Sequence, residues 1–410
     1  MTAQSDHRRA YKARYVFPID ADPIPDGIVV VEGNRIASVG KSCSNSELTD
    51  LGNTALLPGL VNSHTHLQFS TLTQPLGSPG MRFPNWIRLV VEGRRSDGTD
   101  DDLTRRRAIQ QGMEECEKSG TVAVGEIATP SNPIDVYQDS TLDITVFLEL
   151  IGLSNGRVDS LVESAEQYLS TSSETSGCVR PGISPHAPYT VHPELLRRVS
   201  ELSAKKQIPI AMHLAESFEE LELLESGTGP FRELLDDLGA WDATAIPIGT
   251  RPIDYLKMMK PAERVLVIHG NYFADDEITF LSQHRERFSV VYCPRSHAYF
   301  QHARYPLAKM IECGVNVSLG TDSRASNPDL NLFEEMRYVA QNHSEVPLRK
   351  TLEMGTIAAA KALGIENELG SLTIGKRSVF AAVQLPDHDC GDPFEQLFDT
   401  ASGNPRLIVG

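Results

Sequence analysis

Paired cysteines are absent from this chain: its six cysteines are scattered, and none forms a CxxC motif. In a chain of 410 residues this pattern argues against a cysteine-ligated metal site and is typical of reduced, buried thiols in a cytoplasmic protein. No apolar run approaches the roughly 18 residues that a transmembrane helix needs. Because the first residues lack an apolar segment, we also expect no secretory signal.

Acidic residues outnumber basic ones and give the chain a formal charge of -17. A surface of this sign repels polyanions, which argues against nucleic acid or an anionic membrane as the main partner. We therefore expect a small-molecule ligand. The length allows a large core, enough for an α/β barrel and a smaller appended domain.

The middle of the chain alternates apolar runs with helical patterns, which is typical of a parallel sheet with crossover helices. Each run is nearly continuous in its apolar residues, as strands buried on both faces should be. The pattern predicts a (β/α)8 barrel, with catalytic groups at the carboxyl ends of the strands. The eight candidate strands are 56–66, 121–128, 144–153, 179–189, 209–217, 264–272, 289–296 and 315–323.

The two chain ends have a different character, with short amphipathic strands typical of a small antiparallel sheet. A two-residue hairpin is indicated around Gly33 and Asn34, and strand-like segments recur at 370–385 and at the last residues. We expect the ends to pair as one small β-sandwich domain, made of residues 1–55 and 368–410. The barrel would then comprise residues 56–367.

Two histidines, His64 and His66, end the first barrel strand. Strand side chains alternate with period two, so both imidazoles project from one face and can hold a divalent metal ion. His213 ends the fifth strand and Asp322 follows the eighth, at the same mouth of the barrel. Three imidazoles and one carboxylate suit Zn²⁺, or Fe²⁺ by the same ligand preferences, and leave a position open for water.

Acid–base groups follow the same strand ends. Glu216 comes three residues after His213, where it can take a proton from the water and pass it to the substrate. His269 ends the sixth strand and is either a further metal ligand or the group that orients the water. Asp322 can serve both as ligand and as base.

The fourth strand indicates how many metal ions the site holds. A two-metal site in such a barrel needs a bridging ligand there, typically a carbamylated lysine. Segment 179–189 contains no lysine but offers His186, which is better suited to hydrogen-bonding a substrate. We therefore predict a single metal ion.

Together these motifs resemble the amidohydrolase superfamily, in its branch of nucleoside and nucleobase deaminases and chlorohydrolases. The resemblance covers nearly the whole chain and includes PGLVNSHTH (58–66), SPHAPYT (184–190), HLAES (213–217), VIHGN (267–271), YCPRS (292–296) and LGTDSRASNPDLNLFEEMR (319–337). It implies that Glu216 shuttles the proton, His269 assists the water and His186 contacts the substrate. The implied metal ligands are His64, His66, His213 and Asp322. Relatives are often homo-oligomers, so an oligomer is a further expectation.

The stretch 70–98 contains several prolines and glycines, lacks periodicity and is predicted as a long loop over the barrel mouth. In the relatives an aromatic residue of this loop packs near the substrate, and Trp86 is the candidate here. Arginines near the mouth could bind an anionic substrate tail, and Arg157 is the one we select as a substrate contact. The full set is Arg88, Arg94, Arg95, Arg157, Arg295 and Arg324.

The run SPHAPYT most resembles deaminases of S-adenosylhomocysteine, methylthioadenosine and aminodeoxyfutalosine, which hydrolyse the adenine 6-amino group. We therefore expect a metal-dependent deaminase of a 5′-modified adenosine that releases ammonia. One alternative is a deaminase or chlorohydrolase that acts on guanine, cytosine or s-triazine rings. A second alternative is a homologue that binds metal without catalysis. The sequence alone leaves the exact substrate, the native metal and the oligomeric state open.

Overall fold

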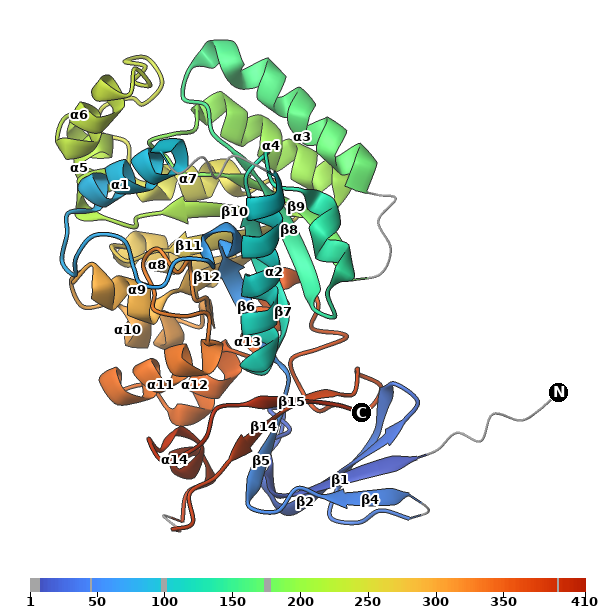
Figure 1. Ribbon diagram of the computed structural model, residues 1–410. Helices are drawn as coiled ribbons and strands as arrows, with labels where there is room; N and C mark the ends of the chain where they lie inside the picture. The colour runs from blue at the N-terminus through green and yellow to red at the C-terminus, as the bar shows by residue number, and fades with distance from the viewer. Residues whose placement is uncertain (1–7, 45, 97–101, 173–177, 389–390) are drawn as a thin grey trace.

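The computed structural model describes residues 8–44, 46–96, 102–172, 178–388 and 391–410 (Figure 1). Its larger part is a barrel of eight parallel strands that neighbour one another in chain order, as the alternating pattern predicted. A bridge between Thr65 and Asp322 brings the end of the last strand back to the first. The strands are β6 (Leu60–Thr65), β7 (Thr121–Ala128), β8 (Asp143–Leu150), β9 (Val179–Pro185), β10 (Pro209–Leu214), β11 (Arg264–His269), β12 (Phe288–Tyr292) and β13 (Asn316–Leu319).

Helices surround the barrel, which explains the apolar character of its strands. Every residue of β7 and β8 is buried, as expected for parallel strands covered on both faces. None of the helices in the described ranges is long and apolar enough to cross a bilayer. The helices are α1 (Phe83–Ser96), α2 (Asp102–Lys118), α3 (Val158–Ser172), α4 (Pro193–Lys206), α5 (Phe218–Ser226), α6 (Pro230–Asp237), α7 (Pro252–Met259), α8 (Asp275–Gln283), α9 (Pro294–Tyr299), α10 (Leu307–Glu312), α11 (Leu332–Asn342), α12 (Leu348–Met354) and α13 (Ile357–Leu363), with short 3-10 turns η1 (Leu67–Phe69), η2 (Ile134–Asp139) and η3 (Asn155–Arg157).

Both chain ends form a small β unit below the barrel in Figure 1, with the short helix α14 (Pro393–Phe398) beside it. The predicted hairpin is present, since Glu32 pairs with Arg35 across Gly33 and Asn34. The seven strands hydrogen-bond as one mixed sheet rather than an antiparallel one, because β4 and β5 both run parallel to β1. The strands are β1 (Arg9–Val16), β2 (Ile24–Glu32), β3 (Arg35–Gly40), β4 (Glu47–Asp50), β5 (Thr54–Pro58), β14 (Val379–Gln384) and β15 (Arg406–Val409).

The apolar run 56–66, predicted as one strand, is two strands in different sheets. β5 pairs with β1 and β14 in the small sheet, whereas β6 pairs with β7 in the barrel. The change occurs at Gly59, whose N–H donates to Val379 O, while the next residue, Leu60, donates to Gly120 O. Both strands are fully buried, so apolar continuity gives no sign that the hydrogen-bonding partner changes.

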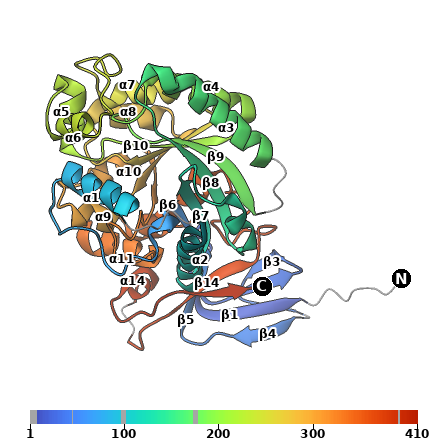
Figure 2. The ribbon, with the colours of Figure 1, turned by 45° about the horizontal axis from the view of Figure 1, so that its top comes forward.

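The stretch 70–98 was also predicted wrongly, because it contains helix α1. Its apolar residues Phe83, Trp86, Ile87, Val90 and Val91 follow the spacing i, i+3, i+4, i+7, i+8 of an amphipathic helix. Pro84 lies in the first turn, where the missing N–H costs nothing. α1 lies beside α6 (Figure 2). The periodic signal was present but was hidden among prolines and glycines.

Gly59 offers a test of the junction between the two sheets. A Cβ at this position would lie 2.3 Å from Val122 Cγ1, and the β-branched valine has little freedom to move. We expect Gly59→Ala to lower the free energy of unfolding by about 1–3 kcal/mol, measured by urea denaturation. Gly40→Ala is the matched control because nothing lies within 4 Å of its Cβ position. Equal stability of the two variants would contradict the packing described.

Candidate active site

Polar contacts close the barrel between β6 and the end of β13. Asn62 Nδ2 donates to Thr321 Oγ1 (2.8 Å), and Thr321 N donates to Asn62 Oδ1 (3.1 Å). One residue further on, Asp322 N donates to His64 O (3.1 Å). Since Asn62 and Thr321 are completely buried, these bonds fix the two strand ends to each other. They place Asp322 beside the first histidine of the HxH pair.

Three histidines face one another at this mouth. His64 and His66 come from the end of β6 and His213 from β10, and one ring nitrogen of each lies within 4.8 Å of the others. Asp322 Oδ1 lies 3.5 Å from His64 Nε2 and 3.8 Å from His66 Nε2. The structure therefore brings together the four residues that were predicted as metal ligands.

Burial favours the neutral form of two of these histidines, which is the form that binds a metal ion. His64 is completely buried, and neither of its ring nitrogens has a hydrogen-bond partner among the described residues. Burial, and then the charges of His213 and His186, hold the pKa of His64 well below its usual value. Burial also lowers the pKa of His213 to about 4. Neutral, buried imidazoles of this kind are ligands for a divalent cation, and the donor set fits one.

Neighbouring groups orient the proposed ligands. His213 Nδ1 lies 3.1 Å from His186 O, so its N–H donates to that carbonyl and Nε2 keeps its lone pair. Ser326 Oγ donates to Asp322 Oδ2 (2.9 Å), which leaves Oδ1 directed at the histidines. Such outer contacts fix the tautomer and the direction of each ligand.

Glu216 lies next to the histidine cluster and contacts His269. Glu216 Oε1 is 3.2 Å from His269 Nε2, and both side chains are almost completely buried. Burial raises the pKa of Glu216 well above its usual value, and the charges of Asp322 and Glu220 add to this effect. The Glu220 carboxylate accepts the N–H groups of Ala215 (2.8 Å) and Glu216 (2.9 Å), which fixes the backbone beneath the acid.

Backbone strain is concentrated at these strand ends. Ala215, His269 and Asp322 have φ angles of 54°, 70° and 58°. The left-handed conformation costs a non-glycine residue about 1–2 kcal/mol. Ala215 directly follows β10, His269 ends β11, and Asp322 lies three residues after the end of β13, where the chain turns away from the barrel. Strain that the surrounding structure sustains at one mouth is typical of a functional site.

The cluster borders a cavity of about 230 Å³ at the carboxyl ends of the strands. His186, Tyr189, Thr190 and Glu149 supply further polar groups to its wall. The rest of the wall is largely apolar and includes helices α1 and α6, with Phe69, Phe83, Trp86, Ile87, Val90, Val91, Ile151, Leu234, Leu235 and Leu238. An apolar cavity with a few convergent polar groups is the usual form of a small-molecule site.

Trp86 and His186, predicted as substrate contacts, both line this cavity. Trp86 is on α1, donates from Nε1 to Ala325 O (3.1 Å) and packs against Phe83, so it is part of the core as well as of the wall. His186 Nδ1 lies 2.7 Å from Thr190 Oγ1, which holds the ring in place.

None of the predicted arginines whose side chains the structure describes lines the cavity. Arg157 is exposed at the end of η3, and Arg88 pairs with Asp237 at the surface. Arg295 is bound by Asp329 and Glu335, and Arg324 is bound by Glu115 and the Leu72 carbonyl. The side chains of Arg94 and Arg95 lie outside the described part of the structure.

Glu126 on β7 supports the HxH segment and was missed in the sequence. Its carboxylate accepts hydrogen bonds from Thr65 Oγ1 (2.8 Å), Leu67 N (3.0 Å) and Tyr137 Oη (3.2 Å), the first two on either side of His66. Complete burial raises the pKa of Glu126 to about 8, although the hydrogen bonds from these three donors lower it. Its signal is an acidic residue inside the apolar run TVAVGEIA, and Glu149 in ITVFLELI shows the same signal.

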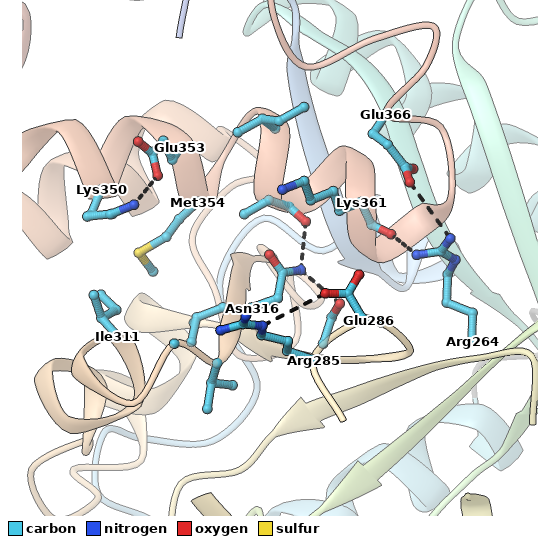
Figure 3. Close-up of a pocket in the computed structure, with 16 residues that line it drawn as sticks. Arg264, Arg285, Glu286, Ile311, Asn316, Lys350, Glu353, Met354, Lys361 and Glu366 are labelled. Carbon is cyan, nitrogen blue, oxygen red and sulfur yellow. Dashed lines mark hydrogen bonds and ion pairs between the residues drawn. The ribbon is translucent and has the colours of Figure 1, made fainter. Parts of the chain in front are cut away.

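A second cavity, of about 340 Å³, lies at the opposite end of the barrel (Figure 3). Arg264 and Asn316, which begin β11 and β13, form part of it. Charged groups around it pair with each other, as Lys350 Nζ does with Glu353 Oε2 (2.6 Å). Because barrel enzymes carry their active sites at the carboxyl ends of the strands, we place the candidate site in the first cavity.

The fold and the mouth residues define a class: a (β/α)8 barrel with a histidine–aspartate centre suited to a metal ion. The sequence pattern of the amidohydrolase family matches residues 55–407, and the chain belongs to this family.

Known proteins similar to the chain include deaminases and a chlorohydrolase. A 5-methylthioadenosine/S-adenosylhomocysteine deaminase of Bacillus cereus (strain B4264) is 28% identical over 382 residues, which cover 88% of this chain and 81% of the relative. The aminofutalosine deaminase of Helicobacter pylori, solved with methylthio-coformycin, has a TM-score of 0.81 at 23% identity and 95% coverage of both chains. An atrazine chlorohydrolase of Arthrobacter aurescens TC1, complexed with zinc, has a TM-score of 0.80 at 19% identity, covering 98% of this chain and 93% of that one. At these identities the structural likenesses confirm the barrel fold alone.

Removing a ligand should remove the metal. We expect His64→Ala and Asp322→Ala to reduce bound metal from about one ion per chain to a small fraction, measured by elemental analysis. His388→Ala is the matched control, because His388 is an exposed histidine paired with Asp399. Metal content equal to that of the control would contradict the site.

Loss of the support behind the HxH segment should weaken metal binding without removing a ligand. For Glu126→Ala we expect a 10- to 100-fold loss of metal affinity, about the effect of an outer-shell partner, in competition with a chelator. Tyr137→Phe removes only one of the three donors and should have a smaller effect. Unchanged metal affinity in a folded Glu126→Ala would show that these hydrogen bonds do not position the histidines.

Proposed function

We propose that this amidohydrolase hydrolyses the bond between C6 and the amino nitrogen of adenine in a 5′-modified adenosine. The candidate substrates are of the methylthioadenosine, S-adenosylhomocysteine or aminodeoxyfutalosine type. Water supplies the oxygen that remains on C6, and the nitrogen leaves as ammonia. The observation that carries the proposal is Glu216, a buried acid 3.2 Å from His269, beside the histidine cluster in a largely apolar cavity. Relatives named as deaminases support it.

We propose one divalent ion at the mouth, Zn²⁺, with Fe²⁺ as the alternative. Its ligands are His64, His66, His213 and Asp322. When bound, such an ion polarises a water molecule and lowers its pKa.

Glu216 is assigned the proton transfer. A carboxyl whose pKa is raised by burial can hold a proton, so Glu216 can take one from water and deliver it to the ring nitrogen. His269 contacts the same carboxyl and orients the attacking water. Asp322 acts as a base toward that water as well as a ligand. His186 and Trp86 contact the substrate from the cavity wall.

A second candidate function keeps the same residues but changes the ring. The likeness to an atrazine chlorohydrolase favours a triazine substrate, and guanine or cytosine are further options. Ammonia release from adenosine analogues and chloride release from chlorotriazines separate these functions. A protein that binds metal and releases neither product would instead be a homologue without catalysis.

Glu216→Gln tests the assigned proton transfer. The amide keeps the shape of the side chain but cannot carry the proton, so we expect ammonia release to fall by about 10²–10⁴-fold. Metal content should stay unchanged, since Glu216 is outside the three-histidine group. Glu225→Gln, on the exposed side of α5, is the matched control. Substantial activity in Glu216→Gln would refute the role.

A further inference from the structure

Glu149 differs from every other buried acid in the described part of the chain. It lies near the carboxyl end of β8, is 3% exposed and lines the active-site cavity. Among the described residues no hydrogen-bond donor reaches its carboxylate, and the nearest ring nitrogen, His186 Nε2, is 3.9 Å away. Each of the other buried acids has a nitrogen or hydroxyl group within 3.2 Å: Glu126, Asp143, Glu216, Glu220, Glu277, Asp322 and Glu335.

A buried carboxylate without donors is costly, so such a group persists where a ligand or function requires it. The open side of Glu149 is the cavity, so the donors that reach its carboxylate there come from water or from a bound molecule that replaces the water. We infer that Glu149 is a substrate-binding residue that accepts hydrogen bonds from hydroxyl or amine groups of the substrate. This inference rests on the proposed function, because the cavity is the proposed active site.

The charge of the cavity extends the inference to the class of substrate. No lysine or arginine is among its lining residues in the described chain, whereas Glu149, Glu216 and Asp322 are. Glu216 is assigned a proton and Asp322 a metal ion, so the like charge that a carboxylate or phosphate on the substrate would face comes from Glu149. Glu149 therefore selects nucleosides with intact hydroxyl groups and a neutral or cationic 5′ substituent, and it disfavours anionic ones.

Binding and turnover of a nucleoside panel test this selection. The neutral members are adenosine and its 2′-, 3′- and 5′-deoxy analogues, and the charged pair is 5′-amino-5′-deoxyadenosine and adenosine 5′-carboxylic acid. Ammonia release is measured with the metal-loaded wild type, Glu149→Gln and Glu149→Ala. Dissociation constants are measured by calorimetry in the Glu216→Gln background, where bound substrate is not consumed. Glu225→Gln serves as the control.

For Glu149→Ala we expect a loss of roughly 10- to 100-fold in affinity and in kcat/KM for adenosine, the effect of a hydrogen bond to a charged group. One deoxy analogue should bind equally well with Glu149 present and in Glu149→Ala. The hydroxyl group that this analogue lacks is then the one that Glu149 contacts. The wild type should prefer the amine over the carboxylate by at least about tenfold, and Glu149→Gln should narrow this ratio. Metal content should not change, which separates substrate binding from a structural role.

The outcomes distinguish this inference from the proposed function. Ammonia release with a selectivity that the Glu149 variants leave unchanged would overturn the inference alone. Nucleoside binding that depends on Glu149 without any ammonia release would overturn the proposed deamination alone. Absence of both would overturn both.

Discussion

Closure of the barrel between β6 and β13 is the contact on which the site depends. β13 is only four residues long, and the buried side chains of Asn62 and Thr321 complete its pairing with β6. The bond from Asp322 N to His64 O then sets the carboxylate beside the histidines. Without this closure, His64 and His66 of the first strand would not be held beside Asp322, which follows the last strand. A bound metal ion would strengthen this closure, because its proposed ligands follow both β6 and β13.

Burial has opposite effects on the two kinds of titratable group at the mouth. It lowers the pKa of His64 and of His213, which favours their neutral, cation-binding form. It raises the pKa of Glu216, which suits an acid that must gain and lose a proton. Hydrogen-bond donors reduce the free-energy cost of burying the carboxyl groups of Glu220 and Glu126. Among the described residues, no such donor reaches Glu149. That difference separates Glu149, which lines the cavity, from Glu126 and Glu220, which hold the backbone of the site in place.

The errors in the sequence prediction share a physical cause. Apolar continuity reports burial and not the identity of the hydrogen-bonding partner, so the change from β5 to β6 at Gly59 was invisible. Proline and glycine around α1 hid a helical period that forms one wall of the cavity. The arginines were assigned by their nearness in sequence to strand ends. Their acidic partners, such as Glu335 for Arg295, come from distant segments that only the fold brings close.

The sequence by itself determined the eight apolar runs, the short amphipathic strands of both chain ends, and the positions of His64, His213 and Asp322 at or shortly after the ends of apolar runs. These features follow from the local spacing of apolar residues, which does not depend on the tertiary structure. Only the tertiary structure decided which side chains share the cavity. It showed that Arg88, Arg157, Arg295 and Arg324 lie outside the cavity wall, that Trp86 is part of the wall, and that Glu149 faces the cavity. Such choices depend on distances between segments far apart in the chain, and no local pattern encodes them.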